Sequence, residues 1–474
     1  MSLYGRQRET DYLDGLLVSG QAEFLAIYGR RRVGKTFLIR EYLKRHLAFE
    51  LTGMLDSPLA DQLANFQSAM KAAGATDAAL PDSWQQAFAQ IADFLLTLPK
   101  DSKQVIFLDE LPWLAGHKAK FLPALDHFWN TFLSRHRHFV LIVCGSAASW
   151  MISKLIHHKG GLHNRVTARL RLEPFTLAET EIFLQSRQVS LTRYDLLTLT
   201  MAFGGVPFYL HEAKPGRSAA QIIDDACFSQ TGLLREEFSR LYASLFDHPE
   251  RHLELVRLLA KHPQGLDRGK LTAVHSSGGG LTRALEELSE AAFITPVRPF
   301  GKKTKDTIYR LSDEYSLFYL RWIEGQRGEG NFLALQNSPA WRTWSGYALE
   351  SLAHRHVPQI KRALGIAGVQ TTHSSWLHRA DATWPQGSQI DLLIDRADNT
   401  INLLEIKFSQ GPFTITKPYA DELRRKLEAF KSVTGTRKNV FLTFLTTHGL
   451  TANAYAAELA HQSLTTDCLF EPQS

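Results

Sequence analysis

The sequence predicts an α/β protein made of two separate α/β parts that are joined by a mostly helical middle. In residues 1–175 short apolar runs alternate with helical stretches, which is typical of a parallel sheet covered by helices. A second α/β pattern occupies residues 341–474, after a Gly-containing segment at 325–340 that we interpret as a linker. A length of 474 residues also favours about two to four domains over one.

The composition excludes several classes of protein. Hydrophobic residues make up 44% and charged residues 22% of the chain, and no apolar run approaches the ~18 residues of a membrane span. The charged first residues lack a signal-peptide apolar region, and three distant cysteines form no disulfide or metal-binding pattern. We therefore expect a cytoplasmic protein without a membrane partner. A net charge of +6 favours a polyanionic partner, but weakly.

Residues 1–175 are expected to form the first sheet, and residues 176–247 a different layer. Residues 176–247 contain no apolar pattern typical of strands and suggest short helices, which we interpret as a lid on the first part. The expected strands of the first sheet are the apolar runs at 24–28, 47–51, 105–108, 140–144 and 166–172.

The strongest local signal is the segment FLAIYGRRRVGKT, in which an apolar strand ends in G-x-x-x-x-G-K-T. Gly29 and Gly34 let the backbone curl so that its N–H groups face phosphate oxygens. In this pattern Lys35 reaches the β- and γ-phosphates, and Thr36 gives its hydroxyl to Mg²⁺. The helix expected over 37–46 points its positive N-terminus at the same anion. The segment therefore predicts a nucleotide site.

Three neighbouring residues are expected to line the same nucleotide. Arg32 and Val33 fill variable positions of the loop, and Phe37 follows its threonine. We assign no catalytic role to the loop arginines, because they can equally be solvated or pair with carboxylates.

Hydrolysis needs a metal ligand and a base, and the segment VIFLDE supplies both. Asp109 is predicted to hold Mg²⁺, and Glu110 to polarise the attacking water. The alternative is a strand that merely happens to end in two acids. The position downstream of a phosphate loop favours ATP hydrolysis.

Two further residues are candidates for sensing the bound nucleotide. Ser146 follows the apolar strand VLIVCG and is a candidate sensor of the γ-phosphate or its water, with a strand-end cap as the alternative. Arg165 is a candidate arginine finger or sensor, although Arg169 and Arg171 nearby fit equally.

Residues 248–324 predict a helix, a Gly-rich turn, a second amphipathic helix and a hairpin, which is the order of a winged helix. Thr282 and Arg283 begin the second helix, at the end with which such helices reach base edges. Later acidic residues in that helix disfavour contact with phosphate, so DNA binding and protein contact both stay open. The hairpin tip is basic and carries Lys302, Lys303 and Lys305.

The segment QIDLLIDRADNTINLLEIKFS predicts two alternating strands, 389–395 and 401–408, joined by the loop RADNT. If their pairing is symmetric about that loop, Asp391 faces Glu405, and Lys407 lies on the same face. Opposed carboxylates repel each other, so we expect a cation between them, and Mg²⁺ is the natural one. Lys407 would orient or activate the metal-bound water.

This D…E-x-K pattern resembles the PD-(D/E)XK nuclease family. That family usually adds an acidic residue from a preceding helix, and Glu350 stands in the matching place. The sequence departs from the family in having Ile390, and not proline, before the aspartate. The alternative is a half-exposed hairpin with scattered acids. The basic helix expected in YADELRRKLEAFK favours the nuclease-like interpretation.

The segments YGRQRE, YGRRRVGKT, VIFLDELPWL, CGSAASWM and GGVPFYL together resemble the AAA-related and STAND-class P-loop ATPases of archaea and bacteria. Within them, the chain resembles the family that joins such an ATPase to a winged helix and a C-terminal nuclease-like domain. The resemblance implies an ASCE-type parallel sheet, with the catalytic strand inserted between the phosphate-loop strand and its neighbour. It also implies that Gly5, Arg6 and Glu9 lie near the adenine.

Two functions follow from these observations. In the first, ATP binding and hydrolysis control a Mg²⁺-dependent nuclease site, with DNA as partner and a homo-oligomer formed through the ATPase domain. In the second, a STAND-type regulatory ATPase carries a C-terminal domain that does not cleave. The presence of every acidic and lysine position favours the first. A third possibility, a chaperone-like adaptor, has no supporting residues.

Overall fold

The computed structural model describes residues 3–116, 120–146, 148–151, 154–155, 161–246, 248–274, 279–325 and 332–472. The chain divides into two compact units. Met1–Pro174, with Ala243–Asp247 and Glu290–Ala292, forms the first, and the rest of the chain forms the second. Among the described residues, no helix is both long and apolar enough to cross a membrane.

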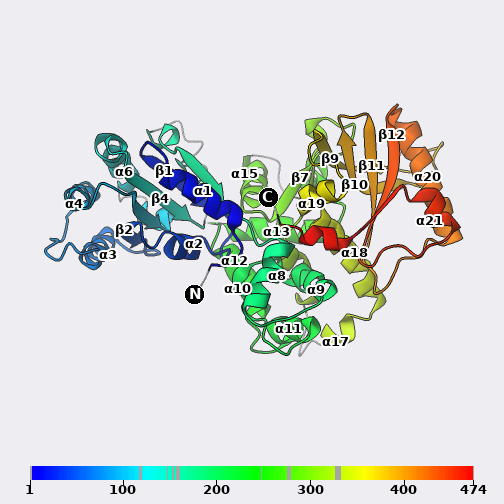
Figure 1. Ribbon diagram of the computed structural model, residues 1–474, viewed down its shortest axis with the longest axis horizontal. Coiled ribbons are helices and arrows are strands. Elements are labelled where there is room, and N and C mark those ends of the chain that lie inside the picture. Colours follow the sequence, from blue (N-terminus) through cyan, green and yellow to red (C-terminus); the bar gives the residue numbers. More distant parts are fainter. Residues whose placement is uncertain are drawn as a thin grey trace. The chain divides into compact units, whose positions relative to one another are not determined.

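The first unit is built on a five-stranded parallel sheet with the order β2–β3–β4–β1–β5 (Figure 1). The five strands expected from the apolar runs are confirmed. Strand β4 lies between β1 and β3, so it is the strand inserted beside the phosphate-loop strand. The bounds are β1 (Glu23–Tyr28), β2 (Leu47–Thr52), β3 (Gln104–Asp109), β4 (Phe139–Gly145) and β5 (Ala168–Arg171).

Alternate residues of these strands face two separate apolar cores, as the two-residue period of a strand requires. Phe24 and Ile106 pack in one core and Leu25 and Val105 in the other, and all four are fully buried. Because both faces are covered, the strands are apolar throughout, which is typical of a parallel sheet. The longer helices of the unit are α1 (Gln7–Leu17), α2 (Lys35–Tyr42), α3 (Leu59–Ala72), α4 (Trp84–Leu96) and α6 (Phe121–Thr131).

The second unit begins with a group of helices. Thr176 and Glu179 form a reciprocal capping box at the start of α8, and Gly204 ends α9 in the left-handed conformation. The sequence predicts this segment as a lid on the nucleotide domain, whereas Phe175–Tyr242 is part of the second compact unit. The helices are α8 (Leu177–Ser186), α9 (Arg193–Phe203), α10 (Pro207–Leu210), α11 (Ala219–Ile223) and α12 (Glu237–Ala243).

The middle of this unit contains a three-stranded antiparallel sheet with the order β6–β8–β7. The two predicted helices and the hairpin are present, and the structure adds β6 and α14 between the helices. The elements are α13 (Pro249–Ala260), β6 (Leu266–Asp267), α14 (Arg268–Val274), α15 (Gly279–Glu290), β7 (Ile294–Val297), β8 (Ile308–Leu311) and α16 (Glu314–Trp322).

The C-terminal part is a mixed five-stranded sheet with the order β13–β12–β11–β10–β9 (Figure 1). Strands β9 to β11 are antiparallel and β11 to β13 parallel. The strands are β9 (Thr371–His378), β10 (Ser388–Arg396), β11 (Thr400–Lys407), β12 (Asn439–Thr446) and β13 (Gln462–Thr465). The helices are α18 (Pro339–Arg355), α19 (Val357–Ala363), α20 (Lys417–Thr434) and α21 (Ala454–Leu459).

The segment predicted as a linker is only partly described. Residues 326–331 lie outside the described part of the chain. After them the short helix α17 (Phe332–Leu335) and the first turn of α18 already occupy the expected linker. Ser338 caps α18 by accepting a hydrogen bond from the Trp341 amide, and Pro339 begins the helix, which fixes its start.

Candidate functional site

The phosphate loop connects β1 to α2 at the carboxyl end of the first sheet. Gly29 and Gly34 have φ values of 137° and 93°, which side chains rarely adopt. A Cβ atom at Gly29 would lie 2.4 Å from the carbonyl oxygen of Leu172, just beyond β5. Gly29 is therefore required both by its own conformation and by the close approach of this neighbouring segment.

Lys35 is held inside the loop by backbone carbonyls. Its Nζ donates to the carbonyl of Gly29 at 3.0 Å and to that of Arg30 at 2.9 Å, and the side chain is buried. Burial lowers the pKa of Lys35, although the nearby Asp109 and Glu110 oppose that shift. An ammonium held by neutral carbonyls is free to exchange them for phosphate oxygens.

The two predicted ligands of Mg²⁺ in this unit lie together. The Thr36 hydroxyl donates to Asp109 Oδ2 at 2.7 Å, and the amide of Glu110 donates to Asp109 Oδ1 at 3.0 Å. A hydroxyl and a carboxylate at one point are oxygen donors of the kind Mg²⁺ takes, with phosphates and water completing its shell. The residues present therefore fit a magnesium nucleotide.

Glu110 and Ser146 are brought together from different strands. Ser146 follows β4, and its hydroxyl donates to Glu110 Oε1 at 2.7 Å while its amide donates to Oε2 at 3.2 Å. Glu110 has a left-handed backbone, with φ of 47°. The strand inserted between β1 and β3 thus fixes the orientation of the predicted base.

The side chain of Arg6 contacts the backbone of the loop. Its Nη2 donates to the carbonyl of Val33 at 2.9 Å and its Nη1 to that of Glu173 at 2.7 Å. Arg6 is only 3% exposed, so it ties the N-terminal segment to the loop. Of the other predicted lining residues, Arg32 has φ of 70° and Phe37 is 37% exposed on the first turn of α2.

The structure separates Arg165 from the loop of its own chain. Arg165 precedes β5 and lies near Asp126, with Nε and Oδ1 4.0 Å apart. Thr167, two residues later, bonds to Phe24 at the start of β1, whereas the loop follows the end of β1. Arg171, paired with Tyr28 at the carboxyl end, is on the loop side of the sheet. A finger role for Arg165 would therefore be toward another copy of the chain.

The second predicted constellation lies on α18, β10 and β11. Register pairs of Asp395 with Ile401 and of Leu393 with Leu403 confirm these two predicted pairs. The observed pairs end at Leu392 with Leu404, so the pair of Asp391 with Glu405 stays a prediction. Each strand is one residue longer at the turn than predicted, so the loop is 397–399. Leu392, Leu393, Leu403 and Leu404 are all buried, so both faces of this strand pair are covered.

Strand β10 carries an irregularity at Asp391. Relative to β9, its register shifts between Ile390 and Leu393, so that both of these side chains join the apolar core beneath α20. Such bulges re-aim a side chain and are frequent next to active sites.

Glu405 is neutralised by side chains that include two from α20. Lys426 donates to its Oε1, the Tyr419 hydroxyl donates to Oε2 at 2.8 Å, and Lys407 Nζ lies 3.4 Å from Oε2. Burial alone would raise the pKa of Glu405, but the two lysines and the tyrosine outweigh it and lower that pKa. Lys426 belongs to the predicted basic helix, whereas Tyr419 was not expected at the site.

The pKa values of Glu350 and Asp391 are shifted in the opposite direction from that of Glu405. Burial raises the pKa of Glu350 well above its usual value, and Asp391 raises it further. The pKa of Asp391 is also raised, by burial and then by Glu405. Within the described residues Glu350 Oε2 is buried and has no hydrogen-bond partner.

These carboxylates fit a cation only in part. The unpartnered oxygen of Glu350 and the nearby Asp391 provide hard oxygen donors. However, both oxygens of Glu405 already have partners, and no three His, Cys, Asp or Glu side chains in the described part of the chain are grouped to hold a metal ion. Asp391 is engaged in part as well, because its Oδ1 accepts a hydrogen bond from Gln389 Nε2 at 2.7 Å. Among these three carboxylates, the buried oxygen without a partner in the described part of the chain is therefore Glu350 Oε2.

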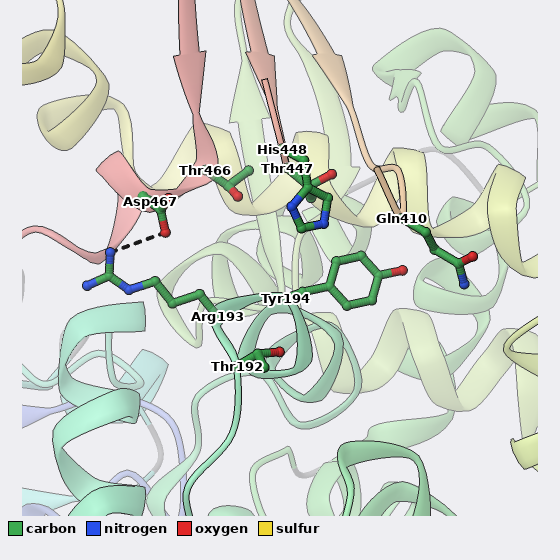
Figure 2. Close-up of a pocket in the computed structure, with 8 residues that line it drawn as sticks. All are labelled: Thr192, Arg193, Tyr194, Gln410, Thr447, His448, Thr466 and Asp467. Atoms are coloured by element: carbon green, nitrogen blue, oxygen red, sulfur yellow. Dashed lines mark hydrogen bonds and ion pairs between the residues drawn. The ribbon is translucent and has the colours of Figure 1, made fainter. Parts of the chain in front are cut away.

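A separate polar cavity of about 370 Å³ lies where α9 meets the C-terminal sheet (Figure 2). The Tyr194 ring stacks on Phe408 with centroids 4.7 Å apart. Arg193 and Asp467, both drawn in Figure 2, neutralise each other at 3.2 Å. The side chains around this cavity therefore pack α9 against the C-terminal sheet. None of the predicted site residues lines the cavity.

Fold and site together define the class of the first unit: a P-loop nucleoside triphosphatase with an extra strand between the loop strand and the carboxylate strand. Residues 3–213 match the model of a family described as an ATPase domain predominantly from Archaea. This part of the chain is therefore an ATPase domain with a nucleotide-binding P-loop.

Three similar proteins illustrate how far the likeness extends. An uncharacterized protein of Methanocaldococcus jannaschii is 24% identical over 435 residues, which are 89% of this chain and 91% of that protein. A Walker-type ATPase of Pyrococcus abyssi is 17% identical, with a TM-score of 0.49 over 67% of this chain and 96% of that chain. The ORC2 protein of Aeropyrum pernix, in ADPNP–ADP complexes, is 16% identical, with a TM-score of 0.41 over 71% of this chain and 96% of that chain.

Proposed function

We propose that this ATPase controls a divalent-metal-dependent phosphodiesterase site in its C-terminal part, and that DNA is the substrate. The proposal joins the ATPase domain to a carboxylate cluster with the composition of a nuclease site. The observation that carries it is Glu350, whose buried Oε2 has no hydrogen-bond partner within the described residues and whose pKa is raised by burial and then by Asp391 and Glu405. Asp391 Oδ1 accepts a hydrogen bond from Gln389 Nε2 at 2.7 Å, so the oxygen that lacks a partner belongs to Glu350. Burying that oxygen beside a second carboxylate is costly unless a cation joins them.

In the first unit the proposed roles follow from the contacts. Lys35 exchanges the loop carbonyls for the β- and γ-phosphates, and Thr36 with Asp109 holds Mg²⁺. Glu110, oriented by Ser146, receives the proton of the attacking water. Arg6 keeps the loop in place by its bond to Val33.

In the second unit Glu350 and Asp391 would hold the metal, with Glu405 as the further ligand. When bound, such a metal lowers the pKa of a water and stabilises the leaving oxygen of a phosphodiester. Lys407, 3.4 Å from Glu405, would orient the nucleophile. Lys426 keeps Glu405 neutralised until the metal takes its place.

The three-stranded middle part supports a winged helix that contacts DNA. In its second helix Thr282 accepts a hydrogen bond from Arg268, and Arg283 pairs with Glu287 at 2.9 Å, so both predicted base-reading side chains are engaged. A further group of exposed cations lies at the wing. Lys302, Lys303 and Lys305 are all exposed between β7 and β8. We therefore assign phosphate contact to the wing.

A second candidate is a regulatory ATPase whose C-terminal part does not cleave. The contacts of Glu405 with Lys426 and Tyr419 favour it, because a carboxylate satisfied by cations of its own chain needs no metal. In that case the C-terminal part would act through binding alone.

Cleavage assays separate the two. The full chain is incubated with single-stranded, duplex and plasmid DNA, with Mg²⁺ or Mn²⁺, and with ATP, a non-hydrolysable analogue or neither. We expect metal-dependent cleavage that Asp391→Asn abolishes without changing ATP hydrolysis. The matched control is Asp395→Asn on the same strand, whose carboxylate pairs with Lys438 at 2.6 Å. Wild-type protein that cleaves none of these substrates leaves the regulatory ATPase as the function.

A further inference from the structure

A cavity of about 540 Å³ lies between the middle part of the second unit and α18. Its walls are α13 with the residues after it, β8, α16 and α18. The charged side chains that line it are Arg257, Lys261, Arg310, Arg321 and Glu324. Four cations against one carboxylate make this cavity a site for an anion.

The single carboxylate is already committed to one of the four cations. Glu324 Oε1 lies 2.9 Å from Arg257 Nε, in an ion pair at the rim. Lys261 and Arg321 are both exposed there, and the Arg321 guanidinium also lies over the Trp322 ring at 5.1 Å. The remaining positive charge is therefore available to a ligand in the cavity.

Arg310 is the deepest of these cations and faces the carboxylate site. Its Nη1 lies 3.2 Å from His354 Nε2, and that nitrogen lies 2.9 Å from the carbonyl oxygen of Asp391. Glu350 and Asp391 both act electrostatically on Arg310. Yet in the described part of the chain no carboxylate lies within ion-pair distance of this half-buried arginine.

The same cavity also presents aromatic rings. Tyr347, on α18, is 40% exposed, and Trp344 is half-buried one turn before it. Trp344 is held by Trp341, with ring centroids 5.0 Å apart. A rigid aromatic surface beside cations is the combination with which proteins bind single-stranded nucleic acid, because bases stack on rings while cations hold the phosphates.

We propose that this cavity binds a single nucleic-acid strand, with Arg310 contacting a backbone phosphate next to Glu350 and Asp391. The inference rests on the proposed function, because the strand bound in this cavity would be the substrate of the carboxylate site. A cavity of about 540 Å³ has the size of a small-molecule site and takes about one or two nucleotides, which excludes a duplex. Arg310 would thus join strand binding to the cleavage site.

Binding of a labelled 20-residue single-stranded DNA to the full chain tests the proposal, by fluorescence anisotropy in EDTA so that no cleavage occurs. The variant Lys261→Glu with Arg321→Glu reverses two exposed cations of the cavity. We expect it to weaken binding at least about tenfold and to flatten the salt dependence of log K by about 1.4, the effect of two lost phosphate contacts. Tyr347→Ala should weaken binding about fivefold or more through lost stacking.

The control is Lys431→Glu with Arg437→Glu, which makes the same change in net charge at exposed positions outside the cavity lining. It should bind like the wild type. Equal binding by the cavity variant and this control would overturn the proposal, and so would wild-type protein that binds no single strand. Asp391→Asn separates this proposal from the proposed function. If the wild type cleaves no DNA while this variant binds the strand normally, the nuclease site is refuted and the cavity assignment stands.

Discussion

The hydroxyl of Ser146 donates to the carboxylate of Glu110 at 2.7 Å, although the two residues follow different strands of the first sheet. The contact exists because β4 lies between β1 and β3, so that its end lies beside the end of β3. We propose that through this contact Ser146 orients Glu110 as the base. A simple strand-end cap would not need this partner.

Ser146→Ala should therefore slow ATP hydrolysis without weakening ATP binding. The amide of Ser146 still donates to Glu110, so we expect kcat to fall about tenfold, against about 100-fold or more for Glu110→Gln, which removes the base itself. Steady-state hydrolysis and titration with a fluorescent ATP analogue give the two quantities. A Ser146→Ala protein with normal kcat would show that the hydrogen bond has no part in catalysis.

Lys35→Ala should abolish nucleotide binding. Within the described residues its ammonium donates to two backbone carbonyls, so the substitution removes the cation that we assign to the phosphates. The glycines should still keep the conformation of the loop. Two charge-assisted hydrogen bonds to phosphate predict a loss of at least about 100-fold in affinity. Arg40→Ala removes a cation from the same helix, one that pairs with Glu50, and serves as the control. Unchanged binding or turnover in Lys35→Ala would contradict the assignment of the nucleotide site.

Local patterns in the sequence predict local structure well in this chain. The loop, its strand and its helix are contiguous, and the register that pairs Leu393 with Leu403 follows from the hairpin alone. The order of the strands in the first sheet came from the family resemblance. The place of Arg165 also follows from the sequence pattern, because a residue that precedes a strand parallel to β1 lies at the edge of the sheet opposite the loop.

The remaining features of the candidate sites depend on contacts between segments that are distant in the sequence. Tyr419 and Lys426 reach Glu405 only because α20 packs on β11, and no spacing in the sequence fixes that packing. The approach of Arg310 to Asp391 likewise joins β8 to β10, about eighty residues apart in number order.

Lys426→Met tests whether that lysine takes the place of a metal. Removing one partner of a buried ion pair should lower the free energy of unfolding by about 3–5 kcal/mol, because Glu405 is left uncompensated. Mn²⁺ should then raise the unfolding temperature of the variant more than that of the wild type, since it can replace the lost charge. Lys431→Met, exposed on the same helix, is the control for stability. If Mn²⁺ stabilises neither protein, Glu405 is not a metal ligand.

His356 predicts how stability depends on pH. Burial, and then Arg355, lower its pKa to about 4, while the Leu352 carbonyl opposes the shift. Its Nε2 accepts a hydrogen bond from the Leu177 amide at 3.3 Å, which ties the end of α18 to the start of α8 and requires a neutral ring.

The direction of the pH dependence follows from the pKa of His356 in the unfolded and folded chains. The unfolded chain protonates this histidine below about pH 6.5, whereas the folded chain does so only near pH 4. Its contribution to stability is therefore constant above pH 6.5 and is lost as the pH falls from 6.5 to 4. Between pH 7.5 and pH 5 the loss should be about 2 kcal/mol. In His356→Gln, which cannot take up the proton, urea unfolding at the two pH values should show a loss smaller by that amount. An equal loss in both proteins would mean that His356 is protonated in the folded state, and the link between α18 and α8 would then not depend on a neutral ring.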